Sequence, residues 1–315
     1  INLDVSNWNT ISTKDISYMF QSCSKLTEID VSRWNTSLVT NMSQAFYSCS
    51  SLISLGEHNV KYWNTSSVTN MGGMFSSCTK ISTLDVSGFN TSKVTNMSSM
   101  FFYCTSLTAL DVSNWDTSSV TKMSHMFNTC SGLSSLDVRN FNTSKVIGSA
   151  NTSVADAFRG MFSGCSKLTT LDVATKPVTA NGKTYTAWDV SNALNMNSMF
   201  SGCSSLVELD LTNWTIGSST NVTIMLNGCS KLSKITTPKE FKNSELTIAL
   251  PKDNGVWYEI DSADAIVNNT VHSTLNSANT NKVLATHKLF ISTNWKSDIV
   301  ISGGSGTAGD LSKVT

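Results

Sequence analysis

Apolar positions recur along most of the chain with a period of 26 residues. The cysteines show it best, because neighbouring cysteines lie 26, 29, 26, 26, 35, 38 and 26 residues apart. The consensus unit reads L-D-V-S-x-W-N-T-S-x-V-T-N-M-S-x-M-F-x-x-C-S-x-L-x-x. Such self-similarity indicates stacked coils, each burying its apolar side against its neighbours. Eight units and a degenerate ninth begin at Leu3, Ile29, Leu55, Leu84, Leu110, Leu136, Leu171, Leu209 and Ile235.

Each unit is predicted to contain a strand, a turn and one short helical turn. Residues 107–112 alternate between apolar and polar side chains, which favours a strand with Leu110 and Val112 inward and Asp111 outward. Asn-Thr-Ser favours a turn, because these side chains bond to their own backbone. Residues 124–127 are typical of one helical turn with a serine near its start. The predicted fold class is an α/β repeat solenoid built on a parallel β coil.

The repeat ends near residue 235, where the composition also changes. All 12 methionines and all 8 cysteines lie before this point. We therefore predict two parts, a repeat array over 1–235 and a small β-rich C-terminal cap or module over 236–315. Three, nine and twelve extra residues interrupt the array within 55–63, 146–161 and 171–188, and we expect them to be loops.

Charge excludes two classes of partner. Charged residues make up 14% of the chain, and 22 Lys and Arg balance 22 Asp and Glu. A protein that binds nucleic acid or an anionic membrane surface needs a basic excess, so neither is expected. No apolar run approaches the ~20 residues of a membrane span. The chain begins at Ile1 without a signal peptide, so we expect it to be a piece of a longer protein.

The repeated V-T-N-M-S-x-M-F-x-x-C-x-x-L-x-x-L-D-V-S motif resembles the 26-residue repeat of BspA-type leucine-rich-repeat surface proteins. The resemblance covers residues 1–235 in eight copies. It implies a leucine-rich-repeat-like coil displayed on a bacterial cell surface, with adhesion or protein binding rather than catalysis as its role. It does not identify the ligand.

The cysteines are predicted to form an inward row of buried free thiols. No C-x-x-C motif and no Cys/His pair at ligand spacing occurs, which disfavours a metal site. Disulfides between neighbouring repeats are the other alternative, but stacked identical rotamers seldom give the required dihedral angle. The row consists of Cys23, Cys49, Cys78, Cys104, Cys130, Cys165, Cys203 and Cys229.

A row of aromatic residues allows two interpretations. The position after L-D-V-S-x holds tryptophan or phenylalanine, as in Trp8, Trp34 and Phe89. An exposed row would be a platform for sugars. Free exchange between tryptophan and phenylalanine favours packing in the core instead.

A row of aspartates also has two interpretations, and it supplies candidate ligand-binding residues. Asp85, Asp111 and Asp137 occupy the same position of successive units. Like charges facing each other along a sheet are destabilising, so something must offset them. Hydrogen bonds to the following turn would do so, and so would a ligand or a cation facing the row.

The two long insertions supply a second candidate binding site. Residues 147–155 and 173–187 lie in consecutive units, so we expect their loops to be neighbours. Lys176, Lys183, Tyr185 and Arg159 would then form a basic and aromatic cluster, a combination enriched at interfaces. The alternative is that the loops only shield an irregular join.

No catalytic residues are predicted, because no histidine recurs in the repeat and no catalytic motif is present. No cofactor and no metal is expected. The predicted function is a non-enzymatic, extracellular cell-surface adhesin or recognition scaffold. Its partner would be a protein or glycan of a host or neighbouring cell. The alternative is a structural subunit of a surface layer or filament that self-associates through its C-terminal module.

Overall fold

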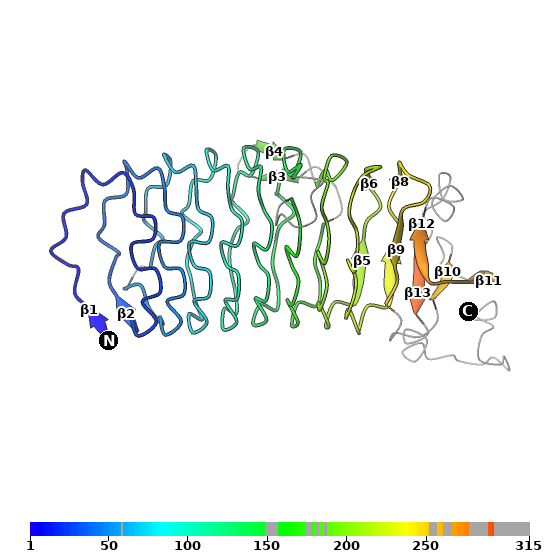
Figure 1. The fold of residues 1–315 in the computed structure, drawn as a ribbon, viewed down its shortest axis with the longest axis horizontal. Helices are drawn as coiled ribbons and strands as arrows, with labels where there is room; N and C mark the ends of the chain where they lie inside the picture. The colour runs from blue at the N-terminus through cyan, green and yellow to red at the C-terminus, as the bar shows by residue number, and fades with distance from the viewer. Residues whose placement is uncertain are drawn as a thin grey trace.

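The chain forms an elongated stack of coils in the computed structural model (Figure 1). The structure describes residues 1–57, 59–148, 157–173, 178–180, 183–185, 188–251, 257–260, 266–276 and 289–292. Successive repeats follow one another along the long axis, from the N-terminal end to the strands near the C-terminus. Each coil contacts its neighbours along the axis, so the apolar side of each repeat is buried by the next.

Short strands are the regular elements of the described residues. They are β1 (Asn2–Leu3), β2 (Glu28–Ile29), β3 (Val178–Ala180), β4 (Lys183–Tyr185), β5 (Glu208–Asp210), β6 (Thr215–Ile216), β7 (Lys234–Thr236), β8 (Glu240–Phe241), β9 (Thr247–Ala249), β10 (Trp257–Ile260), β11 (Ile266–His272), β12 (Thr274–Asn276) and β13 (Leu289–Ser292). Five strands form one sheet in the order β11-β10-β13-β7-β5, and the pairs β1-β2, β12-β9, β3-β4 and β6-β8 form separate sheets. Because β13 pairs antiparallel with β7, the largest sheet crosses the boundary predicted at residue 235.

The predicted α/β solenoid with helical turns is wrong, because the described residues contain no helix. The segment expected to be helical adopts two residues of left-handed backbone per repeat instead. In one unit these are Ser99 and Tyr103, with φ of 57° and 61°, and in the next His125 and Thr129, with 55° and 58°. A left-handed residue at every fourth position breaks a right-handed helix. The segment therefore becomes a series of tight turns.

Those turns point alternate amides toward the next repeat. The N–H groups of Met97, Ser99, Phe101 and Tyr103 donate to the carbonyls of Lys122, Ser124, Met126 and Asn128, at 2.7–2.9 Å. All four bonds have the same direction, from one repeat to the one that follows it. The same pattern begins at Ile16, whose N–H donates to the carbonyl of Asn41. This face is the most continuously hydrogen-bonded part of the stack.

The predicted continuous parallel β coil is also wrong. The L-D-V segments pair only as short strands such as β1-β2 and β5-β7, or as isolated bridges such as Thr83 with Ala109. The physical reason lies in the aspartate of each segment. Its side chain accepts a hydrogen bond from the backbone two residues later, as in Asp85 with Ser87 at 3.1 Å. This turn bends the chain away before a longer ladder can form.

Two columns of rings fill the core. Phe75, Phe101 and Phe127 stack with ring centroids 5.7–6.0 Å apart. In the second column Trp63, Trp115, Trp188 and Trp214 are buried, and each indole N–H donates to the carbonyl of a valine in the preceding repeat. Trp8, at the N-terminal end, is 47% exposed. The aromatic row is therefore core, and it is not a platform for sugars.

The cysteines form a row of free thiols along the stack. All eight are free, and all except Cys23 are buried. Each buried thiol donates to the carbonyl of a phenylalanine in the preceding repeat, as Cys104 does to Phe75 at 3.1 Å. A serine at position 104 could keep this bond, so the hydroxyl would have a partner.

Thiol labelling tests this arrangement. We expect a thiol reagent to modify Cys23 alone in the folded protein at neutral pH, and all eight cysteines after unfolding, because burial excludes both reagent and water from the other seven. Mass spectrometry of the labelled peptides would count the modified sites. Rapid native labelling of Cys104 or Cys130, in the middle of the stack, would contradict the structure.

Candidate binding site

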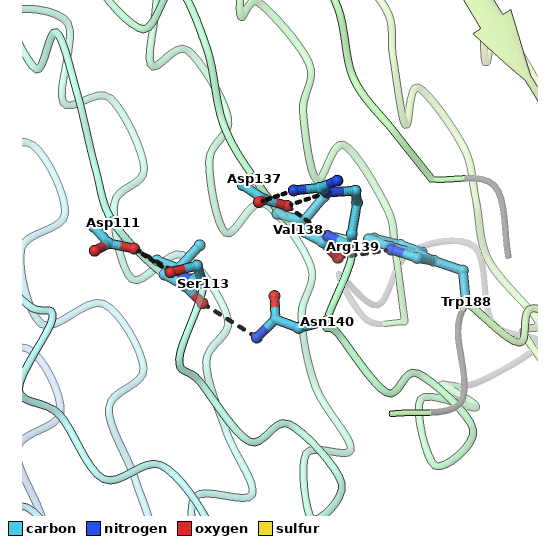
Figure 2. Close-up of polar contacts among 8 residues, drawn as sticks. Asp111, Ser113, Asp137, Val138, Arg139, Asn140 and Trp188 are labelled. Atoms are coloured by element: carbon cyan, nitrogen blue, oxygen red, sulfur yellow. Dashed lines mark hydrogen bonds and ion pairs between the residues drawn. The ribbon is translucent and has the colours of Figure 1, made fainter. Parts of the chain in front are cut away.

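Asx turns hold the aspartate row on the L-D-V face in fixed positions (Figure 2). Oδ1 of Asp111 accepts hydrogen bonds from the backbone N–H and the hydroxyl of Ser113, at 3.0 and 2.6 Å. Asp85 makes the same bonds to Ser87, and its Oδ2 lies 3.5 Å from Nζ of Lys61. The hydrogen bonds to the following turn are thus present in the structure. They restrain the side chains, and they use one of the two carboxylate oxygens.

The pattern changes at Asp137, where arginine replaces the serine of the consensus. Arg139 donates from Nε and a terminal nitrogen to the two oxygens of Asp137, at 3.0 and 2.7 Å, and from its backbone N–H at 3.1 Å (Figure 2). The bond from the Arg139 side chain holds the pKa of Asp137 below its ordinary value, with partial burial opposing it. The same bond, together with the charges of Asp137 and Asp172, raises the pKa of Arg139. A bidentate pair of this kind has a well-defined geometry.

Beside this pair lies a hollow of about 580 Å³, which we call the acidic hollow. It spans three successive L-D-V segments and is lined by Ser135, Leu136, Asp137, Arg139, Thr170, Leu171, Asp172, Glu208 and Asp210. The lining thus carries four carboxylates and one guanidinium. Its volume is within the range of sites that hold small ligands or single side chains.

The acidic hollow unites only part of the predicted site. It includes Asp137, but Asp85 and Asp111 do not line it. Sequence reasoning missed Arg139 and Glu208. Two features of the sequence could have pointed to them. Arg139 stands where the consensus has a serine, and Glu208 directly precedes the L-D pair of β5.

The predicted basic cluster lies mostly outside the described part of the chain. Lys176 falls outside the described residues, and so do the side chains of Lys183 and Tyr185. The backbone of β4 pairs antiparallel with β3, with Lys183 opposite Ala180 and Tyr185 opposite Val178. Arg159 is half-buried, and its carbonyl accepts the N–H of His125 at 2.8 Å. The cluster therefore stays a prediction.

Comparison with known families identifies the repeat. Residues 1–58, 53–168 and 111–237 each match the family described as "Mycoplasma protein of unknown function, DUF285". The chain belongs to the DUF285 family. The DUF285 matches overlap and together cover most of the chain, so the family description applies to the whole repeat stack, including the acidic hollow.

Among solved structures, the DUF285 chain is similar to a leucine rich cell surface protein from Faecalibacterium prausnitzii. The two are 17% identical over 73% of this chain and 76% of that one, with a TM-score of 0.29. No curated protein matches the chain.

The described residues of the DUF285 chain hold no group of three or more His, Cys, Asp or Glu side chains placed to bind a metal ion. Nor do they include a helix with the length and hydropathy of a membrane span.

Proposed function

We propose that this DUF285 protein is a non-enzymatic recognition scaffold on a cell surface, an adhesin in which the acidic hollow binds a basic segment of a partner protein. The extracellular location follows the sequence resemblance to BspA-type surface proteins. The observation that carries the binding proposal is the acidic hollow. It is a concave, charged departure from an otherwise regular stack, in a chain whose net charge is zero.

The charge of the acidic hollow favours a cationic partner. Its four carboxylates face a single guanidinium, that of Arg139, so the lining has an excess of negative charge. Oδ1 of Asp210 accepts hydrogen bonds from the backbone N–H and the hydroxyl of Thr212. Oδ2 can therefore accept a lysine or arginine from a partner. Charged groups at such a surface determine specificity and the rate of association.

Restraint of the carboxylates also favours binding. The Asx turns hold Asp137 and Asp210 before any partner arrives, so little side-chain entropy is lost when a ligand binds. The hollow accommodates one or two cationic side chains, and the rest of the partner would lie across the neighbouring L-D-V segments.

Binding of the intact chain to a panel of extracellular matrix proteins and arginine- or lysine-rich peptides tests the proposal. We expect the double variant Glu208→Gln/Asp210→Asn to lose at least tenfold in affinity, because it removes two of the four carboxylates. Affinity of the parent should fall as the salt concentration rises.

The control is the double variant Glu28→Gln/Asp30→Asn. It changes the same two positions of an earlier repeat, where residues 28 and 29 form β2. We expect it to bind like the parent. Equal losses in both double variants, or no binding to any member of the panel by a folded chain, would count against the proposal.

A role as a structural subunit assembling through residues 236–315 stays a prediction, because much of that segment lies outside the described residues.

A further inference from the structure

A second hollow lies on a different face of the stack, the face where amides point from one repeat to the next. Its volume is about 520 Å³, and it spans the first four repeats. We call it the neutral hollow, because it is lined by Tyr18, Gln21, Ser43, Gln44, Tyr47, Asn70, Gly72, Gly73, Asn96, Ser98 and Ser99, none of which is charged.

Two glycines make room for the neutral hollow. Gly72 and Gly73 occupy the positions that hold Ser98 and Ser99 in the next repeat. A Cβ at Gly72 would lie 2.7 Å from Nδ2 of Asn96, and one at Gly73 would lie 3.0 Å from Cγ of Gln44. Gly73 also has left-handed backbone, with φ of 64°. A side chain at either position would displace the lining or fill the space.

Amide side chains on the lining are already ordered. Nδ2 of Asn96 donates to Oδ1 of Asn70 at 3.0 Å, and Nε2 of Gln44 donates to the hydroxyl of Tyr18 at 3.4 Å. Nδ2 of Asn96 and Nε2 of Gln44 each have a second N–H bond, because an amide nitrogen carries two. Oδ1 of Asn70 also accepts the N–H of Gly72 at 3.0 Å, so both of its lone pairs are used. The backbone N–H groups of Tyr18, Gln44 and Gly73 donate to the carbonyls of Ser43, Gly72 and Ser98 in the following repeats, which restrains the backbone of the lining.

Tyrosines border the neutral hollow on the N-terminal side. Tyr18 is 51% exposed and Tyr47 is half-buried. Tyrosine presents a flat apolar ring together with a polar hydroxyl, and it loses little conformational entropy on binding. The aromatic row is buried except at Trp8, so these tyrosines supply the aromatic surface beside the neutral hollow.

From this combination we propose that the neutral hollow binds an uncharged saccharide. Rings of Tyr18 and Tyr47 can pack against the apolar face of a sugar, while Gln44, Asn70 and Asn96 exchange hydrogen bonds with its hydroxyls. A sialylated or sulfated sugar would bury a charge without a cationic partner on the lining, which is costly.

The proposal extends the proposed function, since it also makes the chain a recognition scaffold, but it uses different residues on a different face. The two sites can therefore fail separately. Variants of the acidic hollow such as Glu208→Gln/Asp210→Asn should leave saccharide binding unchanged.

An array of uncharged, sialylated and sulfated oligosaccharides probed with the intact chain is the first test. We expect binding to uncharged members, followed by saturation-transfer NMR on the best of them. In that assay Tyr18→Ala and Gly73→Asn should each weaken binding at least tenfold. Asparagine tolerates left-handed backbone, so Gly73→Asn fills the hollow with limited strain.

Matched controls separate the hollow from general effects of substitution. Tyr103→Ala removes a tyrosine of similar exposure, 46%, and Ser198→Asn adds an asparagine at the equivalent left-handed position, with φ of 57°. Neither residue lines the neutral hollow, so both variants should bind like the parent. If Gly73→Asn unfolds the chain, the saccharide affinity of Tyr18→Ala is the test of the proposal. The proposal is overturned if uncharged saccharides do not bind, if only acidic ones bind, or if Tyr18→Ala binds them with unchanged affinity.

Discussion

Raising the pH from about 8 to about 10.5 is expected to unfold the repeat stack cooperatively, because its buried thiols cannot ionise in place. Burial raises the pKa of Cys49, Cys104, Cys165 and Cys229 to about 12. Burial likewise raises the pKa of Cys78, Cys130 and Cys203 well above the ordinary value of 9.0. At about pH 8 and below, the thiols are almost entirely protonated in both the folded and the unfolded chain, so their contribution to stability is fully present.

Above pH 9 the unfolded chain loses these protons while the folded chain keeps them. The free energy of unfolding then falls by about 1.4 kcal/mol per pH unit for each thiol. Seven buried thiols together lower it by roughly 10 kcal/mol per pH unit. This is comparable with the 5–15 kcal/mol that separates typical native proteins from their unfolded state. Circular dichroism during denaturant titrations at several pH values, in the presence of a reductant, would measure the fall.

A triple variant provides the control. Replacing Cys78, Cys104 and Cys130 by alanine removes three of the linked protons. The slope of unfolding free energy against pH should then decrease by about 4 kcal/mol per pH unit, whatever the variant does to stability at neutral pH. A parent protein whose denaturation midpoint is the same at pH 8 and pH 10.5 would rule out this role for the thiols.

Phe101→Ala is expected to be the most destabilising single substitution tested at neutral pH. Phe101 is fully buried and lies between the rings of Phe75 and Phe127, with Trp115 at 6.2 Å. Removing a buried phenylalanine side chain costs about 3–5 kcal/mol, because the lost burial and the cavity both contribute. Denaturant unfolding followed by circular dichroism would measure this loss.

Phe102→Ala is the matched control for this substitution, since it removes the same atoms one position along the chain. Phe102 is half-buried and contacts the rings of Tyr103 and His125 on the outside of the stack. We expect it to cost about 1 kcal/mol or less. If the two variants lose equal stability, the ring column is not the main source of stability in the stack.

Periodicity alone was enough to predict which side chains fill the interior. Met100, Cys104, Leu107 and Val112 belong to the repeated apolar positions, and all are buried. Their spacing shows only that they share one side of each coil, and it does not distinguish a helical turn from a series of tight turns. The backbone path was therefore mispredicted, although the core was correct.

The two positions of left-handed backbone in each repeat can be recognised in the sequence, because glycine occupies them in several repeats. Gly73 and Gly160 occupy the first of them, and Gly164, Gly202 and Gly228 occupy the second in their own repeats. Other repeats place Ser99, Tyr103 or His125 there, which hides the requirement in any single unit. Those residues accept an unfavourable φ, at about 1–2 kcal/mol each, because the amides they orient bond to the next repeat.

The candidate sites were harder to predict for a related reason. Both hollows are lined by residues at which a unit departs from the consensus, Arg139 in one case and Gly72 and Gly73 in the other. A consensus sequence does not show residues that occur in a single repeat. These residues lie together only when three or four repeats are stacked, and their arrangement depends on the backbone path, which the sequence did not predict.

Backbone hydrogen bonds join each coil to its neighbours along the long axis of the stack (Figure 1). Some amides donate to the next repeat, as Phe101 does to Met126, and others to the preceding one, as Thr95 does to Thr69. A pull on the two ends of the stack therefore loads these bonds along their own direction. Repeats contact only their nearest neighbours, so every junction carries the full force and the weakest one opens first. Each repeat that opens adds length and relaxes the tension on the others. We therefore expect a protein built in this way to extend under tension in small steps, with its remaining repeats keeping their shape.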